Sequence, residues 1–221
     1  MSDLKIGIVD DHLLFRRSMT LLINTFPEIQ VVVDAENGKQ CISKLITTPV
    51  DVLLLDIEMP VMDGYETCNE VKNRFPDVRI LIVSQLSTRE SIHKMMELGA
   101  HGYFTKNCNP DQLELALRNV YEEGFYFGLE LGSVIKEAML WEKNNAISYA
   151  LSKSLFSERE LQIIKMICKE YKSKEIADKL FINHRTVETH RKNVMDKCNA
   201  KNIIGVILYA LKNEMITVEE L

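Results

Sequence analysis

Several features of specialised protein classes are missing from this sequence. No hydrophobic run approaches the roughly 20 apolar residues that a membrane span needs. Residues 1–5 lack the basic and apolar regions of a secretory signal peptide. The five cysteines are odd in number, far apart and without a C-x-x-C pair, which argues against structural disulfides and a zinc site. We therefore expect a soluble protein of the reducing cytoplasm that does not contact a membrane.

The net charge is small, but the charged residues are unevenly distributed along the chain. The net charge of the 221 residues is −5. Residues 1–150 hold 14 basic and 22 acidic side chains, a balance of −8, whereas residues 151–221 hold 13 and 10, a balance of +3. This asymmetry favours an acidic regulatory domain joined to a domain that binds polyanions. Small charge imbalances are also common on solvated surfaces.

The first half of the chain alternates between strand-like and helix-like patterns. Apolar runs rich in Val, Ile and Leu predict strands at 4–10, 29–35, 50–56, 79–84 and 100–104. Between them, apolar residues recur at helical spacing: Leu13, Leu14, Met19, Leu22 and Ile23; Val71 and Phe75; Leu113, Leu117, Val120 and Tyr121. Strands that alternate with helices predict a parallel sheet covered on both faces.

Polar side chains stand where four of these strands end. Asp10 and Asp11 end the first run, and Asp56 ends the third. Ser84 ends the fourth, and Lys106 follows the fifth. Because ligands of open α/β sheets bind at the carboxyl ends of the strands, we expect these groups to form one site. Clustered carboxylates suit Mg²⁺, and a carboxylate beside an ammonium group suits phosphoryl transfer.

The first half resembles the receiver domain of two-component response regulators, which has a flavodoxin-like fold. The matching residues are Asp10-Asp11, the run Asp56-Ile57-Glu58-Met59-Pro60-Val61-Met62-Asp63-Gly64, and Ser84, Tyr103 and Lys106. The resemblance implies that Asp56 is the phospho-acceptor. It also implies that Asp11, Asp56 and the backbone carbonyl of Glu58 bind Mg²⁺, with Asp10 acting mainly through water. Lys106 would contact the phosphoryl group, and Ser84 and Tyr103 would couple phosphorylation to the surface.

Three positions leave alternatives open. Gln85 stands where the family usually has a small residue, and it either crowds the site or points into solvent. His12 follows the acidic pair at a helix start, where a capping or surface role is favoured over phosphorelay. An aspartyl-phosphate phosphatase would carry another Asp two residues beyond the nucleophile, where this chain has Glu58, so that enzyme class is disfavoured and we do not expect an enzyme.

The pattern weakens after residue 123 and becomes wholly helical from Leu155. Residues 124–153 read as a partly helical linker with a helix at 131–142, and its aromatic trio Phe125-Tyr126-Phe127 is expected to pack on the first domain. Ser157 and Glu160 form a capping-box pattern that opens a helix. Further helices are predicted at 173–180, 184–198 and 203–215.

These later helices resemble a LuxR-type helix-turn-helix. The resemblance rests on Phe156-Ser157-Glu158-Arg159-Glu160, Ser173-Lys174-Glu175-Ile176-Ala177 and Thr186-Val187-Glu188-Thr189-His190-Arg191. Helical spacing puts Val187, Val194 and Cys198 on the inward face of the third helix. It puts Arg185, Glu188, Thr189 and Lys192 on the outward face, where they could meet base edges in a major groove. Lys174, Arg191 and Lys197 are expected to contact phosphates. Glu170 replaces the glycine usual at the turn after the first of these helices.

The whole chain is therefore similar to NarL/FixJ-type response regulators. We expect a receiver domain at 1–123 with a five-stranded, doubly wound parallel sheet, a linker at 124–153, and a four-helix DNA-binding domain at 154–221. The implied partners are a histidine kinase, double-stranded DNA and a second copy of the chain in a homodimer. The alternative is a receiver protein that acts through protein contacts without binding DNA.

Overall fold

The computed structural model describes residues 3–85, 88–106, 109–126, 155–169, 171–213 and 215–216. The chain divides into two compact units, residues 1–131 and 132–221, which we describe separately. The expected helix at 131–142, Phe127 and the turn at Glu170 lie outside the described residues. Within the described ranges, no helix has both the length and the apolar character needed to cross a membrane.

The first unit contains a five-stranded sheet, as the sequence predicted. Its strands are β1 (Leu4–Val9), β2 (Ile29–Ala35), β3 (Val52–Leu55), β4 (Arg79–Ser84) and β5 (Gly102–Thr105). All are parallel, in the order β2-β1-β3-β4-β5. Every residue of β3 is buried, as expected for a central parallel strand with helices on both faces. This is the flavodoxin-like arrangement, and the order reverses between β1 and β3.

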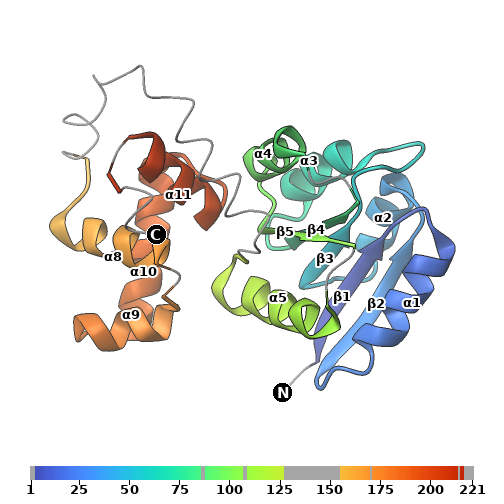
Figure 1. Cartoon of the computed structure of the whole chain (residues 1–221), viewed down its shortest axis with the longest axis horizontal. Coiled ribbons are helices and arrows are strands. Elements are labelled where there is room, and N and C mark those ends of the chain that lie inside the picture. The colour runs from blue at the N-terminus through green and yellow to red at the C-terminus, as the bar shows by residue number, and fades with distance from the viewer. Residues whose placement is uncertain are drawn as a thin grey trace. The chain divides into compact units, whose positions relative to one another are not determined.

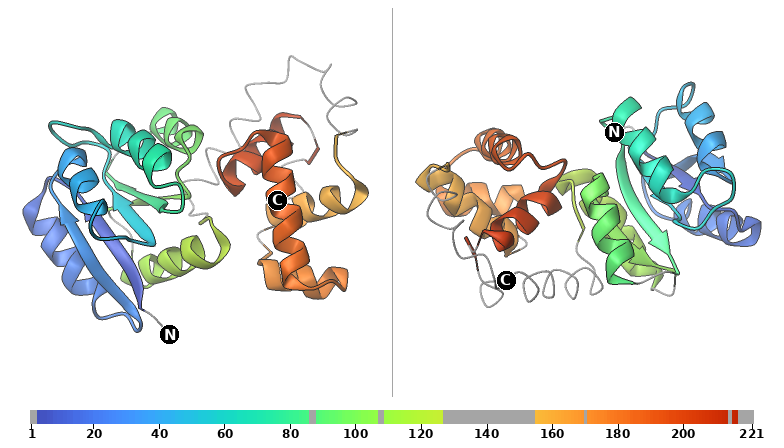
Figure 2. Two further views of the ribbon diagram at one scale, coloured as in Figure 1. Left: turned by 180° about the vertical axis from the view of Figure 1, so that it is seen from behind. Right: turned by 90° about the horizontal axis from the view of Figure 1, so that it is seen from above.

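Two layers of helices cover the sheet (Figures 1 and 2). The helices are α1 (Leu13–Ile23), α2 (Gly38–Leu45), α3 (Gly64–Arg74), α4 (Arg89–Leu98) and α5 (Pro110–Glu123). The side chains of α1 and α5 pack with β1, β3 and β4 in one apolar cluster. Figure 1 shows α2, α3 and α4 on the opposite face of the sheet. Burial of both faces leaves the ends of the strands as the places where polar groups can gather.

Two of the predicted helix faces were partly wrong. Leu13 and Leu14 of α1 are 53% and 81% exposed, and Arg16 is buried in their place. Leu14 lies two residues from Arg16, and two steps of about 100° put it on the opposite side of the helix. On α5, Tyr121 is 43% exposed, and its ring lies 5.4 Å from the Arg79 guanidinium rather than in the core.

The start of the expected linker belongs to the packing of the first unit. Phe125 is buried. Tyr126 donates its backbone N–H to the His101 carbonyl at 2.9 Å, and its ring lies 6.3 Å from that of Phe104. A single parallel bridge pairs Tyr126 with Gly102. These contacts agree with the expected packing of the aromatic segment and extend the ordered structure beyond residue 123.

Burial of His101 predicts an acid-sensitive fold. Its Nδ1 accepts the Ile80 N–H at 3.0 Å, and burial, followed by the positive charges of Lys72 and Arg79, holds its pKa well below the ordinary value. Below the pKa of an unfolded histidine, about 6.5, the unfolded chain binds a proton that the folded chain does not. The free energy of unfolding is therefore expected to fall as pH drops through that value, by up to about 1.4 kcal/mol per pH unit for this group.

The measurement is urea unfolding of the wild type and of His101→Asn, in which the amide oxygen can still accept from Ile80, between pH 7.5 and 5.5. The variant should lose less stability over this range than the wild type, whatever its stability at pH 7.5. Equal pH slopes would contradict the assignment to His101.

The second unit contains four described helices. They are α8 (Glu158–Cys168), α9 (Ser173–Leu180), α10 (His184–Cys198) and α11 (Ile203–Lys212). The predicted capping box is present: Ser157 Oγ accepts the Glu160 N–H, and the Glu160 carboxylate accepts the Ser157 N–H at 2.7 Å. The apolar residues of α11 mainly close the core of this unit, because Ile203, Ile204, Ile207 and Leu211 are all buried.

Candidate functional site

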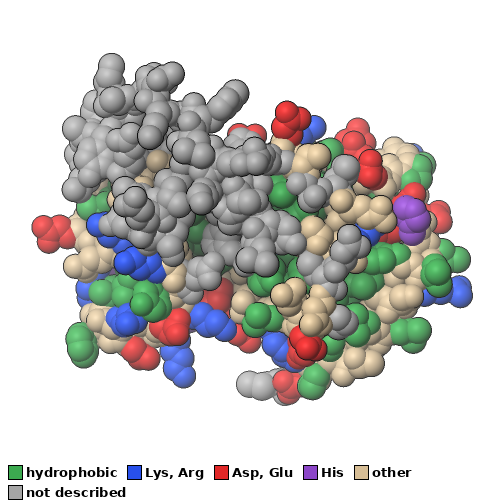
Figure 3. All heavy atoms as spheres, viewed as in Figure 1, with side chains coloured by type: hydrophobic (Ala, Val, Ile, Leu, Met, Phe, Trp, Pro, Cys, Tyr) green, Lys and Arg blue, Asp and Glu red, His purple; other side chains and the backbone are tan. Residues whose placement is uncertain are grey.

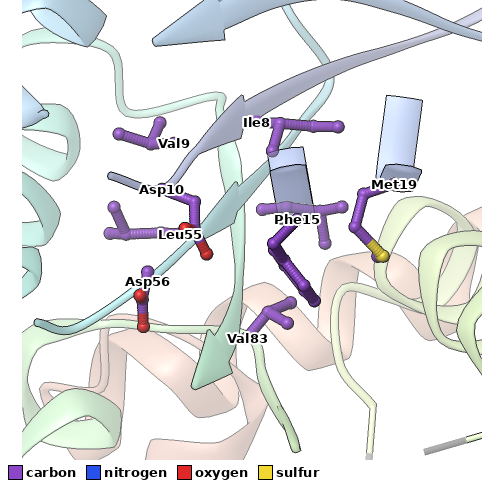
Figure 4. A pocket seen from close by; sticks show the side chains of 9 residues that line it. Ile8, Val9, Asp10, Phe15, Met19, Leu55, Asp56 and Val83 are labelled. Carbon is purple, nitrogen blue, oxygen red and sulfur yellow. The ribbon is translucent and has the colours of Figure 1, made fainter. Parts of the chain in front are cut away.

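The polar residues that end the strands lie together at one edge of the sheet. Lys106 Nζ is 2.6 Å from Asp10 Oδ2 and 2.6 Å from Asp56 Oδ2. Residue 10 follows β1, residue 56 follows β3 and residue 106 follows β5, so three separate strands supply this cluster. Ser84 ends β4, which lies between β3 and β5. Figure 4 shows the Asp10 and Asp56 side chains next to each other.

The core of the cluster is largely shielded from water. The side chains of Asp10, Asp56 and Lys106 are 3%, 4% and 7% exposed. Burial raises the pKa of Asp56, although hydrogen bonding to Lys106 opposes the shift. Burial would lower the pKa of Lys106, but the Asp10 and Asp56 carboxylates outweigh it and raise that pKa. The site therefore sets one ammonium group against two buried carboxyl groups, with a third carboxyl group, that of Asp11, close to them.

Apolar side chains form the floor of the site. A pocket beneath the two aspartates is lined by Ile8, Val9, Asp10, Phe15, Met19, Leu54, Leu55, Asp56 and Val83. Phe15 and Met19 reach it from α1 (Figure 4). Lys106 Nζ also lies 4.7 Å from the centroid of the Phe15 ring. An apolar floor lowers the local dielectric constant and so strengthens every charge interaction at the carboxylates.

The segment after Asp56 is fixed to the backbone of the site by a glycine. A Cβ atom on Gly64 would lie 2.2 Å from the Asp56 carbonyl oxygen, so no other residue fits without a shift of backbone. Gly64 donates its N–H to the Ile57 carbonyl at 2.8 Å, and Asp63 caps α3. Val61, which is exposed, has φ = +73°, a strained conformation for a β-branched residue. The loop that carries Glu58 is therefore tightly constrained at both ends.

The two expected coupling residues are buried. Ser84 is 1% exposed, and its carbonyl accepts the Lys106 N–H at 3.1 Å. Tyr103 is fully buried and pairs in register with Ile82 of β4. Gln85 is exposed, which agrees with the alternative in which it points into solvent. Both coupling residues thus lie within the packed core of the sheet, Ser84 at the end of β4 and Tyr103 on β5, three residues before Lys106.

Arg16 is a site residue that the sequence reasoning missed. Its side chain is 8% exposed, its Nη1 donates to the Asp10 carbonyl at 2.6 Å, and its Nε donates to Asp34 Oδ1 at 2.8 Å. It therefore ties the acidic loop after β1 to the end of β2. The available signal was its position, because Arg16, Met19 and Ile23 share helical spacing on the inward stripe of α1.

Most of the expected DNA-contacting residues are exposed on α9 and α10. Lys174 is exposed on α9, and Arg185, Glu188, Thr189 and Lys192 are exposed on α10. Val187 and Val194 are buried on the opposite side of α10, as predicted, and Cys198 is partly buried. Basic side chains lie on the visible face of this unit with acidic ones among them (Figure 3). The face of α10 that points away from the core is thus mixed in charge.

Two of the residues expected to contact phosphates pair with groups of the same domain. The Arg191 side chain is 5% exposed, hydrogen-bonds Ser173 of α9 through Nη1 and lies 3.5 Å from Glu188 Oε1. Lys197 Nζ is 2.7 Å from the buried carboxylate of Glu160. A long side chain can turn inward when a buried acceptor offers it a partner, and helical spacing alone does not show this. Arg191 ties α9 to α10, and Lys197 ties α10 to the start of α8.

Comparison with known families matches both units. Residues 6–118 match the model of the response regulator receiver domain, and residues 154–210 match that of the luxR family of bacterial regulatory proteins. The chain belongs to the response regulators of the luxR family. It is a receiver domain joined to a LuxR-type DNA-binding domain, which confirms the fold and the family expected from the sequence.

Relatives of this response regulator align along nearly its whole length. It is 33% identical over 216 residues to the oxygen regulatory protein NreC of Staphylococcus epidermidis, covering 96% of this chain and 99% of that protein. NreC of Staphylococcus aureus is 33% identical over 215 residues with the same coverage. Among solved structures, RcsB of Salmonella typhimurium shares the fold, with a TM-score of 0.56, 21% identity and coverage of 95% and 98% of the two chains. ChrA, the response regulator of a haem-sensing two-component system, has a TM-score of 0.52 and 25% identity over 98% and 100% of the two chains.

Proposed function

We propose that this response regulator accepts a phosphoryl group on Asp56 from a histidine kinase and thereby controls transcription by binding double-stranded DNA. The proposal of phosphoryl transfer to Asp56 rests on the contact of Lys106 with both Asp10 and Asp56 at 2.6 Å. The protein would work in the cytoplasm and bind DNA as a homodimer. Its proposed parts are a receiver domain at 1–123, a linker at 124–153 and a DNA-binding domain at 154–221.

The side chains of the site suit phosphoryl transfer in distinct roles. An Asp56 carboxylate oxygen would attack phosphorus, the bond from phosphorus to the imidazole nitrogen of the kinase would break, and its electron pair would return to that nitrogen. Lys106 would neutralise charge on the transferred oxygens. Asp10, Asp11, Asp56 and the carbonyl of Glu58 would hold Mg²⁺, since they offer the oxygen donors it prefers. When bound, the ion would neutralise charge on the phosphoryl oxygens.

Buried neighbours of the site provide a route to the surface of the receiver domain. Ser84 ends the strand between β3 and β5 and could hydrogen-bond the phosphoryl group. Tyr103 lies on β5, in register with β4. A shift of Ser84 toward the phosphoryl group would change the packing between β4 and β5. The fraction of receiver domains with an altered surface would then rise.

DNA binding would rest on the exposed side of α10. Lys192 and Arg185 can donate to guanine, Glu188 can accept from cytosine, and Thr189 can contact a thymine methyl group. Lys174 at the start of α9 remains a phosphate-contact candidate. Arg191 and Lys197 would act indirectly, because their contacts hold α8, α9 and α10 together. Paired half-sites on DNA would double the contacts of a domain with modest charge.

Selection of genomic DNA fragments by the full-length protein, with and without a small-molecule phosphodonor, tests the proposal. We expect a defined set of fragments to be enriched and the enrichment to rise on phosphorylation. If the phosphodonor leaves the enrichment unchanged, this would contradict the control of DNA binding by phosphorylation. No enrichment in either condition would favour the alternative, a receiver that acts through protein contacts alone.

Removal of Arg16 is expected to weaken Mg²⁺ binding and the receiver fold together. In Arg16→Met the carbonyl of Asp10 and the carboxylate of Asp34 lose their shared partner, which is expected to cost about 2 kcal/mol of unfolding free energy. The Asp10–Asp11 loop would then be less fixed, so the dissociation constant for Mg²⁺ should rise several-fold.

Titration calorimetry with MgCl₂ and urea unfolding measure the two effects of this change. The matched control is Arg17→Met, which removes the same charge from the next, exposed residue of α1. Unchanged Mg²⁺ affinity in a folded Arg16→Met protein would show that Arg16 does not position the loop.

A further inference from the structure

His12 stands next to the acidic pair but does not cap the helix that follows it. It occupies the N-cap position of α1, where its side chain makes no capping hydrogen bond. Its imidazole instead turns back toward the carboxylates: Nδ1 is 2.9 Å from Asp11 Oδ1 and 3.5 Å from Asp10 Oδ1. The His12 side chain is 66% exposed. The imidazole thus remains open to solvent while its Nδ1 faces the carboxylates of the acidic pair.

The arrangement matches the spacing of ligands around one ion. Adjacent ligands in an octahedron with bonds of about 2.1 Å lie about 3.0 Å apart, close to the separation of His12 Nδ1 and Asp11 Oδ1. The ligand atoms of Asp10, Asp11, His12 and Asp56 all lie within 4.8 Å of one another. Three of these residues are consecutive in one loop, which Arg16 fixes through the Asp10 carbonyl. The fourth comes from the neighbouring strand.

Lys106 contacts only one oxygen of Asp10 and one oxygen of Asp56. Its Nζ contacts Oδ2 of Asp10 and Oδ2 of Asp56. Asp10 Oδ1 lies on the side of His12, whose backbone N–H it accepts at 2.8 Å. The ammonium group and an ion next to His12 would therefore use different oxygens of Asp10. This separation lets the cluster hold both cations.

We propose that His12 is a metal ligand through Nδ1, and that it gives this site a preference for first-row transition-metal ions over Mg²⁺. The inference rests on the proposed function, because it concerns the same metal site. Imidazole nitrogen favours ions such as Co²⁺, Ni²⁺ and Zn²⁺, whereas an all-oxygen site suits Mg²⁺. A site with three carboxylates and an imidazole accepts Mg²⁺ and binds the softer ions more tightly.

The test is titration of the full-length protein with CoCl₂ and with MgCl₂ by calorimetry, together with the visible absorption of the Co²⁺ complex. In His12→Asn the dissociation constant for Co²⁺ should rise at least about tenfold, while that for Mg²⁺ should change less than about twofold. The d–d bands of bound Co²⁺ should also shift as a nitrogen ligand is lost. Asn is a favourable N-cap residue, so α1 should be retained.

His184→Asn is the matched control, because His184 is an exposed histidine at the first position of another helix, α10. It should leave both dissociation constants unchanged. Equal weakening of Co²⁺ and Mg²⁺ by His12→Asn, or no effect on either, would overturn the role of His12 while leaving the magnesium site intact. Absence of Mg²⁺ binding in the wild type, or Mg²⁺ binding that Asp56→Asn leaves unchanged, would instead overturn the metal site of the proposed function.

Discussion

Replacement of Asp56 with Asn is expected to abolish labelling of the protein by a small-molecule phosphodonor in the presence of Mg²⁺. An amide oxygen is a far poorer nucleophile than a carboxylate, and the neighbouring Asp10 is already paired with Lys106 and accepts the His12 N–H. Asn keeps the size of the side chain and can still accept the Ile57 N–H, which the wild-type carboxylate does at 2.7 Å. Labelling should therefore be lost without loss of the fold.

Intact-protein mass spectrometry measures the labelled fraction after a fixed time with the phosphodonor. Asp51→Asn is the matched control, because Asp51 lies just before β3 at the opposite end of the strand and accepts the Lys5 N–H at 2.8 Å. The control should be labelled as the wild type is. Retained labelling of Asp56→Asn would contradict the assignment of Asp56 as the phospho-acceptor.

The same variant should be at least as stable as the wild type at neutral pH in the absence of Mg²⁺. Burial raises the folded-state pKa of Asp56, so the folded chain holds its proton more tightly than the unfolded chain does. The free energy of unfolding therefore falls as pH rises from the pKa of the unfolded chain through that of the folded one. Asn has no charge to bury. Any gain in the free energy of unfolding from Asp56→Asn should therefore disappear at acid pH, where the wild-type carboxyl group is neutral as well.

Replacement of Lys192 with Ala is expected to weaken specific DNA binding by about 10- to 100-fold, since a good contact to a base edge contributes roughly 1–3 kcal/mol. Lys192 is exposed on α10, on the side opposite the buried Val187 and Val194. The substitution leaves the core of the domain untouched, so the loss should appear in binding and not in the unfolding of this domain.

A gel-shift titration at fixed salt, with a fragment recovered from the genomic selection, measures the effect. The control is Lys201→Ala, which removes the same charge from an exposed residue between α10 and α11. Its effect should be small and independent of the DNA sequence. If the two variants weaken DNA binding equally, Lys192 makes only a non-specific charge contact. If Lys192→Ala does not weaken DNA binding, the exposed side of α10 is not part of the DNA interface.

The main elements of the fold were predictable because their causes are local. Runs of Val, Ile and Leu predicted all five strands within about two residues of where the structure has them. The capping box of Ser157 and Glu160 marked the start of α8 for the same reason, since both hydrogen bonds join residues three positions apart. The last helix ends at Lys212, three residues before the predicted end, since periodicity does not mark where a helix stops.

The position of Arg16 shows where sequence periodicity is insufficient. Periodicity identifies an average inward face, but it does not identify a buried charge that finds acceptors on another strand. The acceptors of Arg16 are the Asp10 carbonyl and the Asp34 carboxylate, 6 and 18 residues away. The same limit applies to Lys197, which pairs with Glu160, 37 residues away. Long cationic side chains are flexible enough that only the packed structure decides their partners.

By itself, the sequence determined the order of strands and helices and the gathering of Asp10, Asp56 and Lys106. Parallel strands bring their carboxyl ends to one edge, so residues at those ends must meet once the strands pair. Only the tertiary structure decided which atoms meet: that Lys106 bridges two carboxylates, that Arg191 turns inward, and that His12 faces Asp11. Those contacts depend on the rotation of each helix and on distances of a few tenths of an ångström, which long-range packing sets.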